Sequence, residues 1–174
     1  GPRINAAGRL DDMTVGIECL VTDSFERGLE LARRLDELNR ERRGIEADMQ
    51  LDALAALGGA QVEGRSTLCL YEPTWHQGVV GLVASRVKEK FHRPTIAFAP
   101  ADADGRELRG SGRSIEGVHL RDTLDLVTKQ APGLIRRFGG HAMAAGLSLD
   151  RDHYEAFGAA FEAAEHPLEH PHVL

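Results

Sequence analysis

The chain has 174 residues, a net charge of −6, and a composition of 42% hydrophobic and 28% charged residues. These proportions are those of an ordinary soluble globular protein with one domain, or one domain plus an appendage. The longest apolar runs are too short to cross a bilayer, and no basic and apolar leader opens the chain. Cys19 and Cys69 lack a CxxC partner, which is typical of buried thiols in a reducing compartment. We therefore expect a cytoplasmic protein.

The first residues of the chain already form a motif. The sequence RINAAGR, at positions 3–9, places Arg3 and Arg9 around Asn5 and several small residues. The chain also starts without methionine. We therefore expect an upstream portion of the polypeptide to precede Gly1.

Residues 24–57 are predicted to form one long helix, capped by Asp23 or Ser24 and ended by Gly58 and Gly59. Apolar residues recur at helical spacings on one side, and three arginines fall on a solvated side: Leu31, Leu35, Leu38, Ile45 and Met49, against Arg40, Arg42 and Arg43. A helix of roughly 50 Å with so narrow an apolar stripe is not stable alone, so the stripe must pack against another part of the protein or another chain. It is either a strut between two domains or a coiled coil, and the broken heptad favours the strut. In this chain alone, we expect the stripe to lack a partner.

Strand and helix patterns alternate after the long helix. Strands are predicted at 67–71, 95–99, 107–110 and 146–149, and helices at 79–91, 118–130 and 152–164. The fold class is therefore α/β, with a long N-terminal connecting helix followed by a mixed-sheet α/β domain of four or five strands. We expect an interdomain segment over 1–59, a substrate-binding domain over 60–165 and a flexible tail over 166–174.

Charge is unevenly distributed along the acidic chain. Residues 106–151 form a net-positive stretch, with 8 Lys and Arg against 5 Asp and Glu. A local basic patch on an acidic body can bind phosphates, because screening confines the interaction to about 8–10 Å. Chance clustering would explain so small a surplus equally well.

Two glycine-rich motifs lie in this basic stretch. In RGSGRS, at positions 109–114, the arginine forks and serine hydroxyls suit a phosphate, although the segment could also be a surface turn. In FGGHAMAAG, at positions 138–146, the glycines allow a helix to start close to a ligand, with His141 among the free N–H groups of that start. The alternative for the second motif is a turn before a buried Ala-rich helix, with a satisfied core histidine.

A further candidate, His76, lies in the sequence WHQGV before a predicted helix. It either caps that helix or faces a cleft, whereas Trp75 is better explained as a core residue. No Asp and His cluster with metal-ligand spacing, Cys-based zinc set or Ser-His-Asp arrangement is evident. The residues alone thus indicate phosphate binding without a catalytic centre.

Four stretches, taken in order, resemble the RecJ family of the DHH phosphoesterase superfamily over nearly the whole chain: 3–9 (RINAAGR), 75–86 (WHQGVVGLVASR), 110–114 (GSGRS) and 139–146 (GGHAMAAG). The GGHxxAAG element is shared with other DHH phosphodiesterases, and the first two stretches are more specific. The resemblance implies an upstream lobe that binds two Mn²⁺ or Mg²⁺ ions and a long helix leading to a DHH-associated lobe. This chain would itself bind no metal.

The resemblance also implies an activity. The whole enzyme would be a hydrolase of DNA repair and recombination that degrades single-stranded DNA from its 5′ end by metal-activated water. This chain would be its substrate-binding half, inactive alone, with a second copy able to associate through the exposed helix. Residues carried over as contacts to the 5′ phosphate and DNA backbone are Arg3, Asn5, Arg9, His76, Ser111, Arg113, Ser114, Gly139, Gly140 and His141. We expect Arg113, on a Gly-flanked turn, to share one phosphate pocket with His141, which would also support catalysis.

Two alternatives stay open. One is a DHH phosphodiesterase acting on cyclic dinucleotides or short oligonucleotides. Those enzymes typically carry GGGHPxAAG, where this chain has Phe138 and Ala142. The other is a non-catalytic module for nucleic-acid binding or oligomerisation that uses the long helix as a coiled coil.

Overall fold

The computed structural model describes residues 1–57 and 62–165 of the chain. It divides into two compact units, Gly1–Met49 and Gln50–Leu174. The predicted domain boundary at 59/60, the helix end at Gly58 and Gly59, and the predicted tail at 166–174 lie outside the described residues. No helix among the described residues is both long enough and apolar enough to span a membrane.

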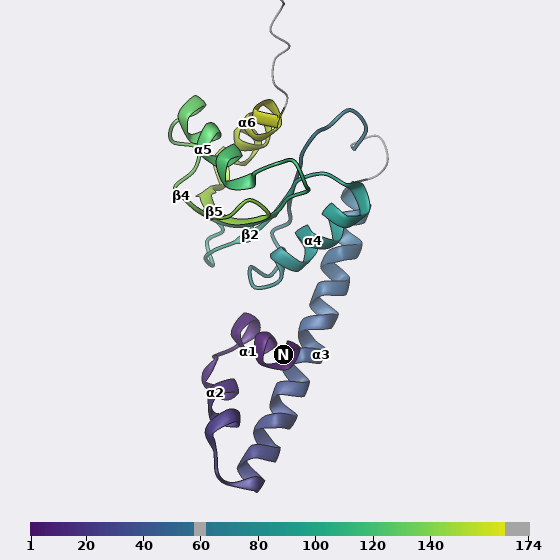
Figure 1. Cartoon of the computed structure of the whole chain (residues 1–174), viewed down its shortest axis with the longest axis vertical. Coiled ribbons are helices and arrows are strands. Elements are labelled where there is room, and N and C mark those ends of the chain that lie inside the picture. The colour runs from purple at the N-terminus through teal and green to yellow at the C-terminus, as the bar shows by residue number, and fades with distance from the viewer. Residues whose placement is uncertain (58–61, 166–174) are drawn as a thin grey trace, which may run out of the picture. The chain divides into compact units, whose positions relative to one another are not determined.

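The first unit consists of helices α1 (Pro2–Leu10) and α2 (Thr14–Val21) together with most of α3 (Phe25–Ala56). Helix α3 confirms the predicted long helix to within one residue at each end (Figure 1). Ala6 and Ala7 of α1 are fully buried and pack against Leu35 and Leu38 of α3. Small side chains at these positions allow the two helices to approach closely.

Two expectations about the long helix are wrong. Its apolar stripe does not lack a partner, because α1 covers Leu35 and Leu38 within the first unit. Arg42 is not on a solvated side, since it is 8% exposed and donates to Glu46 at 2.6 Å and to Asn39 at 3.4 Å. Helix α1 contacts the stripe through two alanines, Ala6 and Ala7, and not through large apolar residues at helical spacing. The sequence pattern therefore did not indicate that this segment packs on the stripe.

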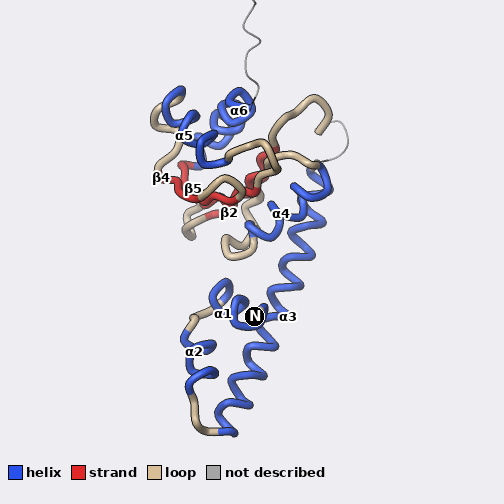
Figure 2. Tube along the Cα trace, in the orientation of Figure 1, coloured by secondary structure: helices blue, strands red, loops and turns tan. Residues whose placement is uncertain are grey.

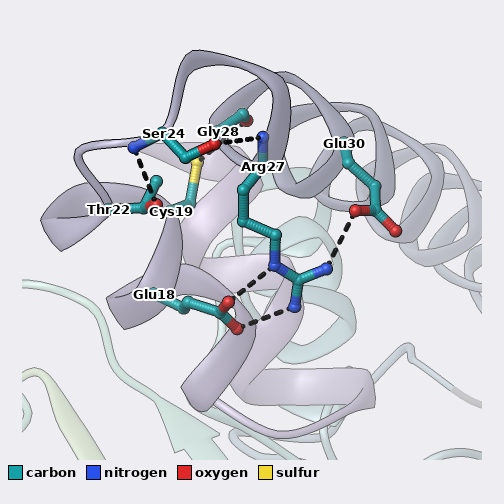
Figure 3. A network of polar contacts seen from close by, with 7 residues as sticks. All are labelled: Glu18, Cys19, Thr22, Ser24, Arg27, Gly28 and Glu30. Carbon is teal, nitrogen blue, oxygen red and sulfur yellow. Dashed lines mark hydrogen bonds and ion pairs between the residues drawn. The ribbon is translucent and has the colours of Figure 1, made fainter.

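A polar network around Arg27 holds the turn between α2 and α3 (Figure 3). Arg27 donates to both carboxylate oxygens of Glu18, at 2.6 and 3.0 Å, and to Glu30 at 2.9 Å. The hydrogen bond from Arg27 lowers the pKa of Glu18. Ser24 Oγ accepts from the Arg27 N–H at 3.3 Å, which confirms the expected cap. Because these groups are exposed, the network fixes the turn more than it stabilises the unit.

The second unit contains a sheet, drawn in red in Figure 2. It has five strands in the order β1-β2-β3-β5-β4. Strands β1 and β2 are parallel and the other neighbours are antiparallel, which confirms the predicted mixed sheet. The strands are β1 (Leu68–Tyr71), β2 (Thr95–Pro100), β3 (Glu107–Arg113), β4 (Arg137–Gly140) and β5 (Ala144–Asp150). Strand β4 was not predicted, and β3 runs three residues beyond its predicted end at Gly110.

Helices cover the two faces of this sheet, and their bounds are α4 (Val80–Phe91), α5 (Leu120–Gln130) and α6 (Tyr154–Glu165). Figure 1 shows α5 and α6 on one side of the sheet and α4 on the other. Phe157 and Phe161 of α6 are fully buried with Phe98 and Leu108, so the core lies under α5 and α6. Residues of β3 alternate between this core and the opposite face, as a pleated strand requires.

Candidate functional site

The sheet face that looks away from α5 and α6 carries polar and small residues of β3, β5 and β4. Directly paired residues of antiparallel strands place their side chains on the same face. Three cross-strand rows therefore share this face: Arg109–Ser148–Arg137, Ser111–Gly146–Gly139 and Arg113–Ala144. Basic and hydroxyl side chains thus surround a centre of glycine and alanine.

A cleft of about 380 Å³ opens on this face. Its lining combines the start of α4 with three strands and includes Gln77, Val80, Arg109, Ser111, Arg137 and Ser148. Gly146 lines it as well, and a Cβ added at the neighbouring Gly139 would meet no atom within 4 Å. The cleft is therefore an open groove flanked by arginines and serine hydroxyls.

Arg113 is half-buried at the end of β3, under the first turn of α4. Its Nη1 donates to Ser111 Oγ at 3.1 Å and to the Gly112 carbonyl at 2.7 Å. A Cβ on Gly81 of α4 would lie 2.8 Å from Arg113 Nη2, so a larger residue at this position would displace the end of the Arg113 side chain. The expected Gly-flanked turn is wrong, since Arg113 pairs with Thr95 and Ala144 inside the sheet.

The motif FGGHAMAAG forms a β-hairpin. Strand β4 ends at Gly140 and β5 begins at Ala144, and the His141 N–H donates to the Ala144 carbonyl at 2.8 Å. Gly140 has a φ of 145°, and a Cβ there would lie 2.4 Å from the Ala144 oxygen, so the turn requires glycine. Both the expected helix start with its anion site and the alternative of an Ala-rich helix are wrong, because the alanines after His141 lead into a strand.

Arg113 and His141 reach the same end of the face although they are far apart in the sequence. Ala144 pairs with Arg113 on one side and accepts the hydrogen bond from His141 on the other. At about 5 Å for each cross-strand step, the Cα atoms of Arg113 and His141 lie about 10 Å apart. His141 is exposed and Arg113 half-buried, an arrangement that is compatible with the expected shared pocket.

Ser114 and His76 make hydrogen bonds that shape the surrounding loops. Ser114 is 1% exposed, and its Oγ donates to the Val118 carbonyl at 2.7 Å. His76 Nδ1 accepts from the Gly78 N–H at 3.0 Å in the turn before α4. Both residues therefore position the segments from which neighbouring side chains reach the face. Trp75 is buried, as expected of a core residue.

Arg3, Asn5 and Arg9 all lie on α1 of the first unit. Arg3 Nε donates to Asp36 Oδ1 at 2.7 Å, and this hydrogen bond lowers the pKa of Asp36. Asn5 is exposed and Arg9 is half-buried. A second cleft, of about 640 Å³, is lined here by Arg3, Ala32, Arg33, Asp36, Glu37 and Arg40.

Sequence reasoning did not propose three polar residues that line the first cleft, Gln77, Arg137 and Ser148, and it noted Arg109 in the motif RGSGRS without assigning it a DNA contact. The spacing of Arg109, Ser111 and Arg113, two residues apart, was an available signal, because alternate residues of a strand share a face. This signal requires a strand that extends to Arg113, whereas the predicted strand ended at Gly110. No comparable spacing indicated Arg137, because strand β4, in which it lies, was not predicted.

Within residues 1–57 and 62–165, no group of three or more His, Cys, Asp or Glu side chains is arranged to hold a metal ion. The donors on this face, guanidinium and hydroxyl groups, are of the kind that hydrogen-bond to phosphate oxygens.

Comparison with known proteins finds close relatives. The chain is 53% identical over 165 residues to the single-stranded-DNA-specific exonuclease RecJ of Escherichia coli K12, and 56% identical over 166 residues to that of Dickeya dadantii. Each match covers 92% of this chain and 28% of the relative, so the chain spans about 28% of the length of these proteins. Crystal structures of RecJ from Thermus thermophilus in complex with Mg²⁺ or Mn²⁺ match with a TM-score of 0.82 and 31% identity, over 94% of this chain and 24% or 23% of theirs. The family model of the DHHA1 domain matches residues 64–167, and the chain therefore belongs to the DHHA1 domain family.

Proposed function

We propose that this chain is the substrate-binding half of a 5′→3′ single-stranded-DNA exonuclease. In this proposal the exposed sheet face holds the 5′ phosphate and the adjoining backbone of the strand. The relatives are named single-stranded-DNA-specific exonucleases, and their similarity runs through 92% of this chain. The observation that carries the proposal is the convergence of Arg113, Ser111 and His141 at one end of a face lined with small residues.

Arg113 is suited to a terminal phosphate by the way it is held. Two hydrogen bonds from Nη1 fix the plane of its guanidinium before any ligand arrives. A planar fork matches the geometry of phosphate oxygens, and preorganisation reduces the entropy lost on binding. His141, exposed in the hairpin, can donate a further hydrogen bond to the same phosphate or support proton transfer. Gly139 and Gly140 would let the backbone approach the ligand.

The remaining residues predicted from the sequence have separate places in this proposal. Ser114 and His76 support the site through the loops that they hold, while Ser111 contacts the ligand through its hydroxyl. Arg3, Asn5 and Arg9 would contact the DNA backbone from the first unit. Mn²⁺ or Mg²⁺ would be held by an upstream lobe and would supply the activated water. The residues of this chain bind and orient the substrate.

The partners in this proposal are single-stranded DNA with a 5′ end and the upstream lobe of the same polypeptide, in the cytoplasm. The first unit also exposes Ile17, Leu20, Val21 and Phe25, whose exposed fractions run from 56% to 84%. Apolar surface of this kind marks interaction sites. In the isolated chain a second copy would cover it, so the expected self-association would use α2 and the start of α3.

The proposal is tested by DNA binding to the full-length protein that contains this chain. Arg113→Ala should weaken binding of 5′-phosphorylated single strands by about 10- to 150-fold, the effect of losing a charge-assisted contact. Binding of single strands with a 5′ hydroxyl should weaken less, because they lack the phosphate that Arg113 contacts in this proposal. Arg113→Lys, which retains the charge without the fork, should give an intermediate loss if the fold is intact.

Arg121→Ala is the matched control, because Arg121 is an exposed arginine on α5, which covers the opposite face of the sheet. It should leave both affinities unchanged. An equal loss on phosphorylated and unphosphorylated strands would contradict the assignment of the 5′ phosphate. Failure of the wild-type protein to bind or degrade any single strand would overturn the function itself.

A further inference from the structure

Ser148 lines the cleft, and its hydroxyl has no hydrogen-bond partner among the described residues. It is 4% exposed, and its Oγ is among the described buried polar atoms that have no hydrogen-bond partner. A buried hydroxyl without a partner costs folding free energy, so a well-packed protein rarely retains one without a reason. Because Ser148 contributes to the lining of the cleft, a ligand there can complete its hydrogen bonds once the side chains that cover the hydroxyl shift.

Two arginines flank Ser148 on the neighbouring strands. Arg109 of β3 and Arg137 of β4 both pair directly with it, and both are exposed and line the cleft. The paired acids at this end of β3 and β5, Glu107 and Asp150, are bridged by Arg136. Arg136 offsets one of these two negative charges, and with Arg109 and Arg137 of the row this end of the face keeps a net positive charge.

We infer that the row Arg109–Ser148–Arg137 binds an internal phosphodiester group of the DNA strand. It would be a second phosphate site, separate from that of Arg113. The inference rests on the proposed function, because it requires a single strand on this face. Two guanidinium forks and a hydroxyl supply the hydrogen-bond donors that phosphate oxygens need.

The spacing of the two sites fits one extended ligand. Arg109 and Arg113 are four residues apart on β3, which corresponds to about 13 Å along a strand. Ser111 lies between them on the same face and also lines the cleft. Because α4 lies over Ser111 and Arg113, the DNA strand would run beside α4, over the glycines of β5 and β4, and a later phosphate would reach the row.

The test compares a long ligand with one that has no internal phosphate. Full-length protein without divalent ions is titrated with a 5′-phosphorylated strand of about ten nucleotides and with a nucleoside 5′-monophosphate. Arg109→Gln and Arg137→Gln should each weaken binding of the strand by about tenfold, and the monophosphate not at all. The slope of log affinity against log salt should fall by about 0.7 for each phosphate that the variant no longer neutralises. Arg121→Gln on α5 is the control for charge.

Ser148→Ala separates a ligand contact from a structural role. Since the hydroxyl has no partner in the part of the chain that the structure describes, its removal should leave the melting temperature equal or higher. The same variant should weaken binding of the strand several-fold and leave the monophosphate unaffected. A lower melting temperature with unchanged binding would show that the hydroxyl is structural and would overturn the inference.

Other outcomes are equally decisive. If Arg109→Gln and Arg137→Gln weaken binding of the strand and of the monophosphate equally, the row belongs to the first phosphate site. If they weaken binding of neither ligand, the row does not contact the DNA. If Ser148→Ala changes only the competition by inorganic phosphate, the row is a site for the free anion and the inference is wrong. If the wild-type protein binds no single strand, the proposed function fails together with the inference. If the variants of the row bind the strand as tightly as the wild-type protein does, while Arg113→Ala still weakens binding, only the inference has failed.

Discussion

Gly140 is the residue on which the conformation of the candidate site depends most directly. Its φ of 145° and the 2.4 Å that would separate an added Cβ from the Ala144 oxygen leave no room for a side chain. The turn that carries His141 is closed by the hydrogen bond between His141 and that same oxygen. A change at Gly140 would therefore move His141 as well.

Gly140→Ala should lower the free energy of unfolding by about 1–3 kcal/mol, because a side chain forces the residue out of this φ region. Turnover of the full-length enzyme should fall with it. Gly139→Ala is the matched control, since an added Cβ there meets nothing within 4 Å and the stability should change little. Denaturant unfolding of both variants measures the difference. Equal stability of the two variants would contradict a specific requirement for glycine at 140.

Cys69 gives the second unit a dependence on alkaline pH. Burial raises the pKa of its thiol from 9.0 to about 12. Between these values the folded chain retains a proton that the unfolded chain releases, so the stability present below pH 9 decreases as the pH rises toward 12. Burial also raises the pKa of Tyr154, which acts in the same direction.

We expect Cys69→Ala to lose stability less steeply than the wild-type protein between about pH 9 and about pH 10.5. Urea unfolding at a series of pH values measures the slope, with Cys19→Ala in the first unit as the control. Identical slopes for Cys69→Ala and the wild-type protein would show that the Cys69 thiol contributes nothing to this pH dependence.

At the scale of elements, the parts that could be predicted from the sequence are those with large apolar side chains at regular spacing. Helices α3, α4 and α6 were predicted to within two residues at either end. The end of β3 and all of β4 were missed, because glycines occupy positions that apolar residues would mark in a strand. Phe98 and Leu147 fill the space beside Gly110, so a larger side chain cannot be there.

The candidate site divides in the same way. The motifs identified Ser111, Arg113 and His141, because their residue types suit phosphate. They could not identify Arg137 or Ser148, whose common row depends on pairing between strands. Pairing of this kind is decided by tertiary packing and leaves no local pattern in the sequence.

The contact between α4 and β3 can be tested through Gly81. An added Cβ would lie 2.8 Å from Arg113 Nη2 and 2.9 Å from Ser111 Oγ, both at the ends of polar side chains that can move. Gly81→Ala should therefore change the stability little, since better helix propensity offsets the crowding. It should displace Arg113 and weaken binding of 5′-phosphorylated strands by about tenfold.

Gly44→Ala is the control for Gly81→Ala, because Gly44 lies in α3 with nothing within 4 Å of an added Cβ. It should raise the free energy of unfolding by about 0.5–1 kcal/mol and leave DNA binding unchanged. If Gly81→Ala behaves like Gly44→Ala in both measurements, close packing of α4 on Arg113 has no role in binding.

At the scale of the whole molecule, the proposed function gives this chain the binding of substrate, and its described residues form no group arranged to hold a metal ion. It spans about 28% of the length of its curated relatives. We expect the isolated chain to release no mononucleotides from 5′-phosphorylated single strands with Mn²⁺ or Mg²⁺, under conditions in which the full-length enzyme does. Activity that survives repurification of the isolated chain would contradict this division of labour.

The glycine and alanine centre of the candidate face has a consequence for the base sequences that the proposed exonuclease could discriminate. Contacts to phosphates carry no information about base sequence. A surface that grips by arginine forks, serine hydroxyls and bare backbone would accept every sequence with similar affinity. Each nucleotide removed would also expose an equivalent phosphate for the next cycle, so the same contacts would serve from the first nucleotide of a strand to the last.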